Sequence, residues 1–246
     1  MINIVYSEFL KLKRTYLLFL VILAGIFIPG MMYFSGTYAD NVQNIDKTSC
    51  LNAISNINIF QFEILDIIIF SIICGYVFSR EYTNMTAGSL YSYPVSKFKI
   101  IIGKFIIILS LIFIVYIINF ISTIMFILRI FGTLFIEEVV YMQLKTIVIS
   151  FLLQIILIPL PSLIACISKN IIIPTVYGII AAIVSFFMSI SEIYMQLCPF
   201  LLPSLPYYYF YRKDTIDNIA VLLSGTLIFL IPIIIFIYYL MKTDIN

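Results

Sequence analysis

The chain contains no histidine and no tryptophan, and only 11% of its 246 residues are charged. Without histidine it lacks the side chain that most often shuttles protons near neutral pH and binds metals. No GxxxxGK[ST] and no HExxH motif occurs; Gly103-Lys104 is followed by Phe105 and lacks the upstream glycine of a phosphate-binding loop. We therefore expect that the protein is not an enzyme and holds no cofactor or metal in this chain.

Charge and cysteine content exclude two further classes. The net charge is only +2, so bulk charge predicts no nucleic-acid partner. The four cysteines form no CxxC pair, which argues against a zinc site. Cys74 and Cys166 lie in apolar runs and are expected to be small buried residues. In the topology predicted below, Cys50 and Cys198 fall on the same side of the membrane. We expect both to be free thiols, and a disulfide between them is the alternative.

Apolar residues dominate what is present. They make up 63% of the chain, and the mean hydropathy is +1.15. A soluble domain has about 45–50% apolar and about 25% charged residues. The apolar runs are continuous over roughly 20 residues, which is the length of a membrane-spanning helix. Since only helices and closed barrels satisfy their backbone in lipid, the sequence predicts an all-α, polytopic membrane protein with one transmembrane domain, residues 1–246.

Six transmembrane helices are expected. They lie near residues 15–36, 59–79, 103–128, 145–167, 171–191 and 220–241. Only Ser168-Lys169-Asn170 separates the fourth helix from the fifth, which predicts a tight helical hairpin. The longest loops are then 80–102 on one side, and 37–58 and 192–219 on the other.

Residues 1–14 precede the first span. Apolar side chains recur there at helical spacing, at Ile2, Val5, Phe9 and Leu12. This pattern predicts a short amphipathic helix lying on the inner membrane surface. The alternative is a frayed polar tail.

The distribution of lysine and arginine predicts the orientation. The face that holds the N-terminus carries nine: Lys11, Lys13, Arg14, Arg80, Lys97, Lys99, Lys104, Lys169 and Lys242. The opposite face carries five: Lys47, Arg129, Lys145, Arg212 and Lys213. Positive residues favour the cytoplasmic side, so both termini are predicted to be cytoplasmic.

The loop after the second span is too long for a simple turn and polar enough to leave the bilayer. Leu90 and Tyr91 have the character of anchors that pack into a partner's groove. Pro94 ends such an element. Ser96 is expected to cap the next helix, whose basic residues Lys97, Lys99 and Lys104 would lie at the inner headgroups.

This stretch carries a resemblance to a known family. Its pattern is Phe-x-x-Glu at 78–81, Leu-Tyr-x-x-Pro-x-Ser-Lys at 90–97 and Gly-Lys at 103–104. The pattern and the layout of the whole chain resemble the permease subunits of ABC-2-type transporters. By length and layout, the chain most resembles the branch of the bacitracin and lantibiotic self-protection permeases. An ordinary amphipathic loop with positive-inside lysines is the alternative.

The resemblance implies an ABC-2, type V exporter-like architecture. Residues 80–99 would form a cytoplasmic coupling loop that docks on a separate ATPase subunit, with Arg80 and Glu81 at its border. Its contact residues would be Leu90, Tyr91, Pro94 and Lys97. ATP and Mg would then be bound by a dimer of ATPase subunits. The further partners implied are a second permease copy or a homologous permease, the lipid bilayer and a peptide antibiotic.

Two carboxylates open the second span. Glu63 and Asp66 are three residues apart, so we expect both to face one side of a helix. Carboxylates at membrane depth are costly and usually functional, which makes these two a candidate substrate path for cationic groups of an exported peptide or a subunit contact. The alternative is that both lie at the outer headgroups, where water solvates them.

Residues 192–219 are apolar but interrupted by Pro199, Pro203 and Pro206, which leaves pieces too short to cross a bilayer. Tyrosines follow and suit a headgroup belt: Tyr207, Tyr208, Tyr209 and Tyr211. By resemblance the segment is a re-entrant outer gate that includes the three prolines and Tyr207. A surface loop without a gating role is the alternative.

The sequence therefore favours the permease subunit of an ATP-driven exporter in a bacterial cytoplasmic membrane, removing a bacitracin- or lantibiotic-like peptide for immunity or resistance. The alternatives are a non-transport scaffold or sensor and an ABC-2 exporter of another amphipathic substrate. An ion-coupled carrier is a further rival, but it normally has more charges near the midplane than this chain shows.

Overall fold

The structure is a computed structural model that describes all residues except 1, 14, 36–46, 87–95, 134–135 and 243–246. The described residues form α-helices and short π- and 3-10 segments. In chain order these are α1 (Ile2–Leu12), α2 (Leu17–Phe34), α3 (Lys47–Ile59), η1 (Phe60–Leu65), α4 (Asp66–Thr83), α6 (Lys97–Phe131), α7 (Ile136–Leu157), α8 (Pro159–Ser168), α9 (Ile172–Met188), α10 (Glu192–Leu197), η2 (Pro199–Ser204), α11 (Leu205–Tyr207), η3 (Tyr208–Arg212) and α12 (Asn218–Lys242).

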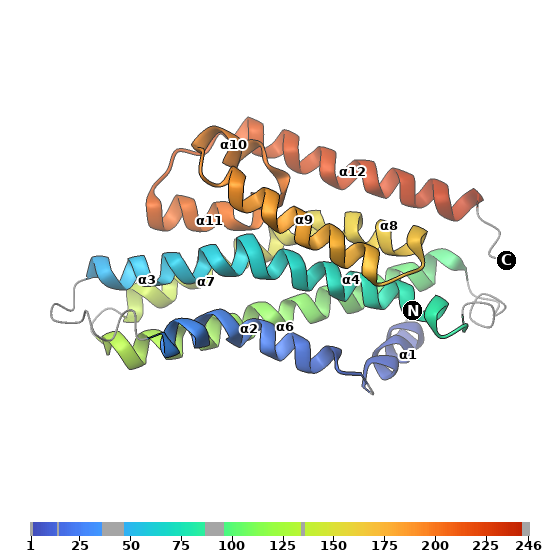
Figure 1. Cartoon of the computed structure of the whole chain (residues 1–246), viewed down its shortest axis with the longest axis horizontal. Helices are drawn as coiled ribbons and strands as arrows, with labels where there is room; N and C mark the ends of the chain where they lie inside the picture. Colours follow the sequence, from blue (N-terminus) through green and yellow to red (C-terminus); the bar gives the residue numbers. More distant parts are fainter. Residues whose placement is uncertain (1, 14, 36–46, 87–95, 134–135, 243–246) are drawn as a thin grey trace.

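The long helices run roughly along one common axis (Figure 1). At one end of this bundle lie α1, the end of α4, the start of α6 and the last turn of α12. The short pieces from α10 to η3 pack against α7, η1 and α12, away from α1. The end of α4 and the start of α6, which are the described parts of the predicted coupling region, therefore lie at a different end of the bundle from the predicted outer segment.

Among the described residues, five helical segments are long and apolar enough to cross a membrane. They are Leu17–Phe34, Lys47–Thr83, Phe98–Phe131, Ile136–Ser168 and Asn218–Tyr239. The fifth predicted span is a shorter apolar helix, α9, with 17 residues. The all-helical, multi-pass prediction is therefore confirmed for the described residues.

The second helical segment begins much earlier than predicted. We expected an outer loop over residues 37–58, but helix starts at Lys47 and continues through the π segment η1 to Thr83. Polar residues made this stretch look solvated in the sequence. In the fold it is buried, with Cys50, Ala53 and Ile54 fully inaccessible.

Other boundaries also move outward. Helix α6 begins at Lys97 rather than 103, with Ser96 as its N-cap residue but without a side-chain capping hydrogen bond. The fourth span begins at Ile136 rather than 145 and breaks between α7 and α8, where Pro159 removes a backbone donor. The predicted hairpin is confirmed: Lys169 takes a left-handed conformation, φ 53°, directly after α8, and α9 packs back against α8.

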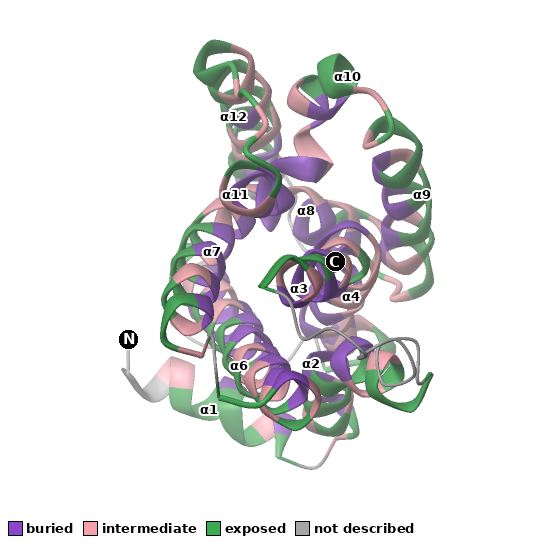
Figure 2. Ribbon diagram, turned by 90° about the vertical axis from the view of Figure 1, so that its left-hand side faces the viewer, coloured by how far each residue is buried: buried purple, intermediate pink, exposed green. Residues whose placement is uncertain are grey.

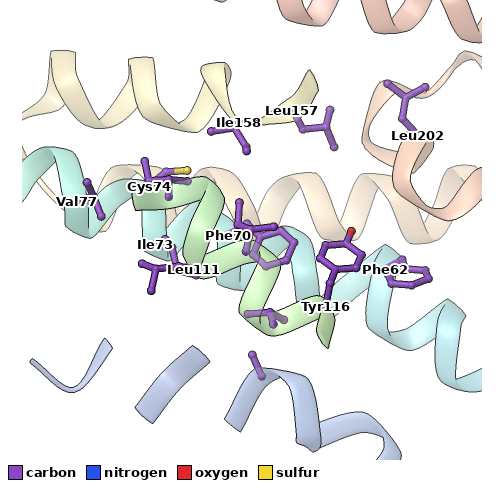
Figure 3. Packing of buried hydrophobic residues seen from close by; sticks show 14 of the residues in the cluster. Phe62, Phe70, Ile73, Cys74, Val77, Leu111, Tyr116, Leu157, Ile158 and Leu202 are labelled. Carbon is purple, nitrogen blue, oxygen red and sulfur yellow. The ribbon is translucent and has the colours of Figure 1, made fainter. Parts of the chain in front are cut away.

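The core lies between α4, α6 and α7. The ring of Tyr116 stacks on Phe62 at 5.8 Å and on Phe70 at 5.9 Å between centroids, and these side chains meet in Figure 3. Aromatic pairs at this spacing add to the free energy gained by burial. Ile73, Cys74 and Leu111 extend the same cluster along α4 and α6.

Buried faces turn inward and exposed faces outward around the bundle (Figure 2). The outward faces carry large apolar side chains, such as Phe187 and Leu222, both 66% exposed. An apolar exterior of this kind is suited to lipid. Inside, small residues allow close approach: a Cβ at Gly178 would lie 2.6 Å from the Cβ of Ser71, so α9 packs tightly on α4.

Candidate functional site

An ion-paired group occupies the α1 end of the bundle. We call it the Glu81 cluster, and its members are Glu8, Lys11, Arg80, Glu81 and Lys104. The two oxygens of the Glu81 carboxylate accept hydrogen bonds from different lysines, Nζ of Lys11 at 3.0 Å and Nζ of Lys104 at 2.7 Å. Glu81 therefore joins α1 and α6 to the end of α4.

Further contacts tighten the same junction. Nη1 of Arg80 donates to the carbonyl oxygen of Lys11 at 2.5 Å, and Lys11 also pairs with Glu8 one turn earlier in α1. Burial alone lowers the pKa of Lys11, but the nearby carboxylates Glu8 and Glu81 outweigh it, so the pKa is raised. The charge on Lys11 therefore stabilises the docked α1 at neutral pH, and this contribution is lost only as the pH rises through the raised pKa.

The structure corrects the prediction for Lys104. We expected it at the headgroups, but the residue is only 1% exposed, its ammonium pairs with Glu81, and it lies 5.2 Å from the centre of the Phe78 ring. The carboxylate supplies the partner that a buried ammonium requires. Lys99 is exposed, as a headgroup position would require. Lys97 begins α6, and its side chain lies outside the described residues.

The Gly-Lys pair at the start of the third span has a steric explanation. A Cβ at Gly103 would lie 3.0 Å from Cγ2 of Ile4, so glycine lets α1 approach α6 closely. Lys104 then reaches Glu81 from the next position. The Glu81 cluster depends on both residues.

The Glu81 cluster lies at both ends of the predicted coupling loop in the sequence. Arg80 and Glu81 are its first two residues, and Lys104 follows its end. The contact residues Leu90, Tyr91 and Pro94 lie outside the described residues, so their role stays a prediction. What the structure provides is a braced junction of α1, α4 and α6, through which a displacement of the loop would reach the bundle.

A second polar group surrounds the π segment η1. Oε1 of Glu63 accepts hydrogen bonds from the hydroxyls of Tyr207, at 2.9 Å, and Tyr208, at 2.7 Å. The hydroxyl of Ser185 donates to the backbone carbonyl of Glu63 at 2.5 Å. The predicted path residue Glu63 and the predicted gate residue Tyr207 are therefore in direct contact.

Asp66 has other partners than Glu63. It accepts a hydrogen bond from Nε2 of Gln61 at 2.5 Å, and its charge is close enough to interact with Tyr116 of α6. The expectation that both carboxylates share one face of an α-helix is thus wrong, because Glu63 lies in a π-helical turn and Asp66 directly after it. Water does not solvate the two carboxylates, as the headgroup alternative requires, since Glu63 is fully buried and Asp66 is 1% exposed; their depth in a membrane stays a prediction.

The outer segment is divided as the prolines predict. Pro199 opens η2, Pro203 lies within it, and Pro206 lies in α11. The tyrosine belt is corrected in part: Tyr207 and Tyr208 are buried through their bonds to Glu63, whereas Tyr209 is exposed. Burial of these side chains makes the segment part of the packed bundle and not a loose surface loop.

All four cysteines are free and buried. Cys50 lies in α3 and Cys198 directly before η2, and no disulfide joins them. Among the described residues, no group of three or more histidine, cysteine, aspartate or glutamate side chains could hold a metal ion.

A line of buried polar side chains on α7 was not predicted. It consists of Gln143, Thr146, Ser150 and Gln154. The spacing of three and four residues places them on one face of the helix, and this spacing in an apolar span was the available signal. Gln143 exchanges two hydrogen bonds with Asn58, at 3.0 and 3.1 Å, and its Oε1 also accepts from Tyr211 at 2.9 Å. These contacts link α3, α7 and η3.

The apolar exterior and the long helices define a multi-pass helical membrane protein. Residues 4–188 match the family described as ABC-2 family transporter protein, and the chain belongs to that family. It is thus a membrane component of an ABC transporter, a class that works with an ATPase partner. No curated protein and no solved structure matches the chain.

Proposed function

We propose that this chain is the permease subunit of an ATP-driven exporter and receives its energy through residues 80–99. Membership of the ABC-2 family supports this most directly. The Glu81 cluster adds a physical route, since it fixes the ends of α4 and α6, which flank the loop, to each other and to α1. ATP and Mg would be held by a dimer of partner ATPase subunits.

The six-span topology is part of the proposal. Helix α9 would bring the number of crossings to six. Because 17 residues are only just enough to cross a bilayer, α9 would be tilted little. An even number of crossings is supported by the position of α1 and the last turn of α12 at the same end of the bundle (Figure 1). With that end cytoplasmic, α1 would lie on the inner membrane surface as the interfacial helix.

Energy would pass from the ATPase to the bundle by rigid contacts. Closure of the ATPase would push on the loop contacts Leu90, Tyr91 and Pro94. The buried Glu81–Lys104 pair cannot slip without leaving a charge unpaired, so α4 and α6 would move as one unit. The full assembly would contain a second permease, identical or homologous, in a bacterial cytoplasmic membrane.

The substrate proposed is an amphipathic peptide antibiotic of the bacitracin or lantibiotic kind, taken from the membrane. Buried carboxylates at Glu63 and Asp66 support a path for cationic groups, because carboxylates at membrane depth are usually functional. Pro199, Pro203, Pro206 and Tyr207 would form the outer gate. An exporter of another amphipathic cation is the second candidate.

The test of the coupling route uses the tagged chain expressed in its own host. The tagged protein should bring down an ATPase subunit, and Leu90→Asp with Tyr91→Asp should abolish this and the resistance of the cells. Lys13→Asp, a charge change at an exposed position at the same end of the bundle but outside residues 80–99, is the matched control and should retain both. If no ATPase is recovered and the double variant leaves resistance intact, the proposal fails and a scaffold or sensor is favoured.

The test of the substrate path changes charge without volume. Glu63→Gln with Asp66→Asn should weaken resistance while expression and ATPase recovery persist. Unchanged resistance with normal expression contradicts a role for these carboxylates in the path.

A further inference from the structure

The Glu63 side chain joins two distant parts of the chain. Its Oε1 accepts both tyrosine hydroxyls, of Tyr207 and Tyr208, whose rings lie 4.1 Å apart between centroids. The carboxylate belongs to the π segment η1, in the middle of a long apolar helical segment, whereas the tyrosines lie within the outer segment, where α11 meets η3. Hydrogen bonds to a charged acceptor are among the stronger contacts in a protein, so this point holds the outer segment to the bundle.

The other oxygen of the same carboxylate is not used. Oε2 of Glu63 is buried and has no hydrogen-bond partner among the described residues. The hydroxyl of Ser189 is near the carboxylate, but it donates its hydrogen to the carbonyl oxygen of Phe186 at 2.8 Å and is therefore not available to Oε2. No ion pair to Glu63 is found in the described part of the chain within 4.0 Å.

A cation of this chain approaches from the exposed side. The guanidinium of Arg212 lies over the ring of Tyr208, 5.2 Å from its centre, and acts electrostatically on Glu63. The arrangement runs from a buried carboxylate through an aromatic ring to an exposed guanidinium. Carboxylates and aromatic faces are the two groups that recognise ammonium and guanidinium ions.

We propose that Glu63, Tyr207 and Tyr208 form a ligand-operated latch, in which an ammonium or guanidinium group of the exported molecule binds Glu63 and releases the outer segment. The proposal rests on the function proposed above, and it names the chemical group that the path would recognise. The ligand cation would bind the free Oε2 and lie against the tyrosine rings. Because the carboxylate would then be neutralised, its bonds to the two hydroxyls would weaken and the segment would separate from η1.

Release would be local, because other contacts hold the segment elsewhere. Tyr211 donates to Gln143 of α7, and Leu201 and Leu202 are buried in the core. The part freed would be the region next to Glu63. Cys198 reports on that region, since it is 4% exposed and directly precedes η2, which packs against η1, the segment that holds Glu63.

The experiment measures the rate at which a maleimide labels Cys198 in the purified full chain in lipid nanodiscs. Cys50, Cys74 and Cys166 are first replaced by alanine, so that Cys198 is the single thiol. Tyr207→Phe with Tyr208→Phe should label about tenfold faster or more, because each lost bond to a charged acceptor is worth more than a tenfold change in equilibrium. Tyr209→Phe makes the same chemical change at an exposed position and should label at the parent rate.

The ligand arm uses dodecylamine, an ammonium ion at pH 7, and dodecanol, its uncharged analogue. Dodecylamine should accelerate the labelling of Cys198, and dodecanol should not. A chain whose single thiol is Cys50, which is buried in α3, should show no acceleration and so excludes general loosening. Glu63→Gln should remove the response to the amine; if this variant does not fold, the amine and alcohol comparison in the parent decides.

Two results overturn the proposal. Equal labelling in the double tyrosine variant and in Tyr209→Phe shows that no latch exists. Equal responses to dodecylamine and dodecanol, or a response to the amine that persists in folded Glu63→Gln, show that Glu63 is not the cation site. Neither measurement needs an ATPase, so a failure here is distinguishable from a failure to recover the ATPase partner.

Discussion

Nζ of Lys104 lies 2.7 Å from Oε2 of Glu81, and both side chains are almost completely buried. If Glu81 were removed, the buried ammonium of Lys104 would have no carboxylate to pair with, because Glu81 is its single carboxylate partner among the described residues. The pair ties the start of α6 to the end of α4. Its removal therefore tests both the stability of the fold and the proposed route of energy transfer.

Glu81→Ala should destabilise the protein strongly. Leaving one partner of a buried ion pair without the other typically costs about 3–5 kcal/mol. The free energy of unfolding in mixed micelles, measured by titration with denaturing detergent, gives the size of the loss. Lys99→Ala, which removes an exposed charge from the same turn region of α6, should change it by less than about 0.5 kcal/mol.

The double change Glu81→Leu with Lys104→Met tests the same relationship from the other side. It leaves no unpaired charge at this position, and apolar replacement of a buried ion pair is often neutral. We expect it to be more stable than Glu81→Ala, even though Lys11 retains only Glu8 as a partner. A double variant that is less stable than Glu81→Ala contradicts the interpretation that the unpaired charge of Lys104 destabilises the single variant.

Sequence patterns identified the fold class and most helices because membrane spans are long and continuously apolar. The runs at 15–36 and 220–241 are apolar almost throughout, and α2 and α12 lie close to these predicted bounds. Helix α3 was missed because its residues are polar for a membrane segment. Its burial depends on contacts such as Asn58 with Gln143, 85 residues away, which no local pattern reveals.

The site residues followed the same rule. Glu81 was recognised because it belongs to a local motif, but its partners Lys11 and Lys104 come from other helices. The contact between Glu63 and Tyr207 spans 144 residues and depends on a π-helical turn. Helical spacing assumes an α-helix, so it assigned Glu63 and Asp66 to one face.

Gly103→Val should detach α1 from the bundle. The new Cβ would lie 3.0 Å from Cγ2 of Ile4, and the branched side chain leaves no room for adjustment within the helix. Limited proteolysis of the purified chain should cut after Lys11 or Lys13 faster in this variant. Gly30→Val is the control, because a Cβ there meets its first neighbour only at 3.8 Å. Equal cleavage of the two variants contradicts close packing of α1 on α6.

The amide pair between Asn58 and Gln143 should matter more than an ordinary surface contact. Gln143→Leu leaves the Asn58 amide and the Tyr211 hydroxyl without this partner in a buried site, at a cost of about 1–3 kcal/mol for each unsatisfied group. Unfolding in mixed micelles measures the loss. Tyr141→Leu, an exposed substitution on the same helix, should have little effect, and a similar loss for both variants would show that the amide pair is not specifically stabilising.

The four thiols give a prediction that needs no substitution. All four cysteines are free and buried, so a water-soluble thiol reagent should modify almost none in the folded protein and all four after denaturation without reductant. Tyr16→Cys places a thiol at a 91% exposed position and should react in the folded state, which shows that the reagent reaches the protein. Recovery of only two thiols from the denatured, unreduced parent would mean that Cys50 and Cys198, or another pair, form a disulfide. The packing around the bonded cysteines would then differ from the one described, in which all four thiols are free.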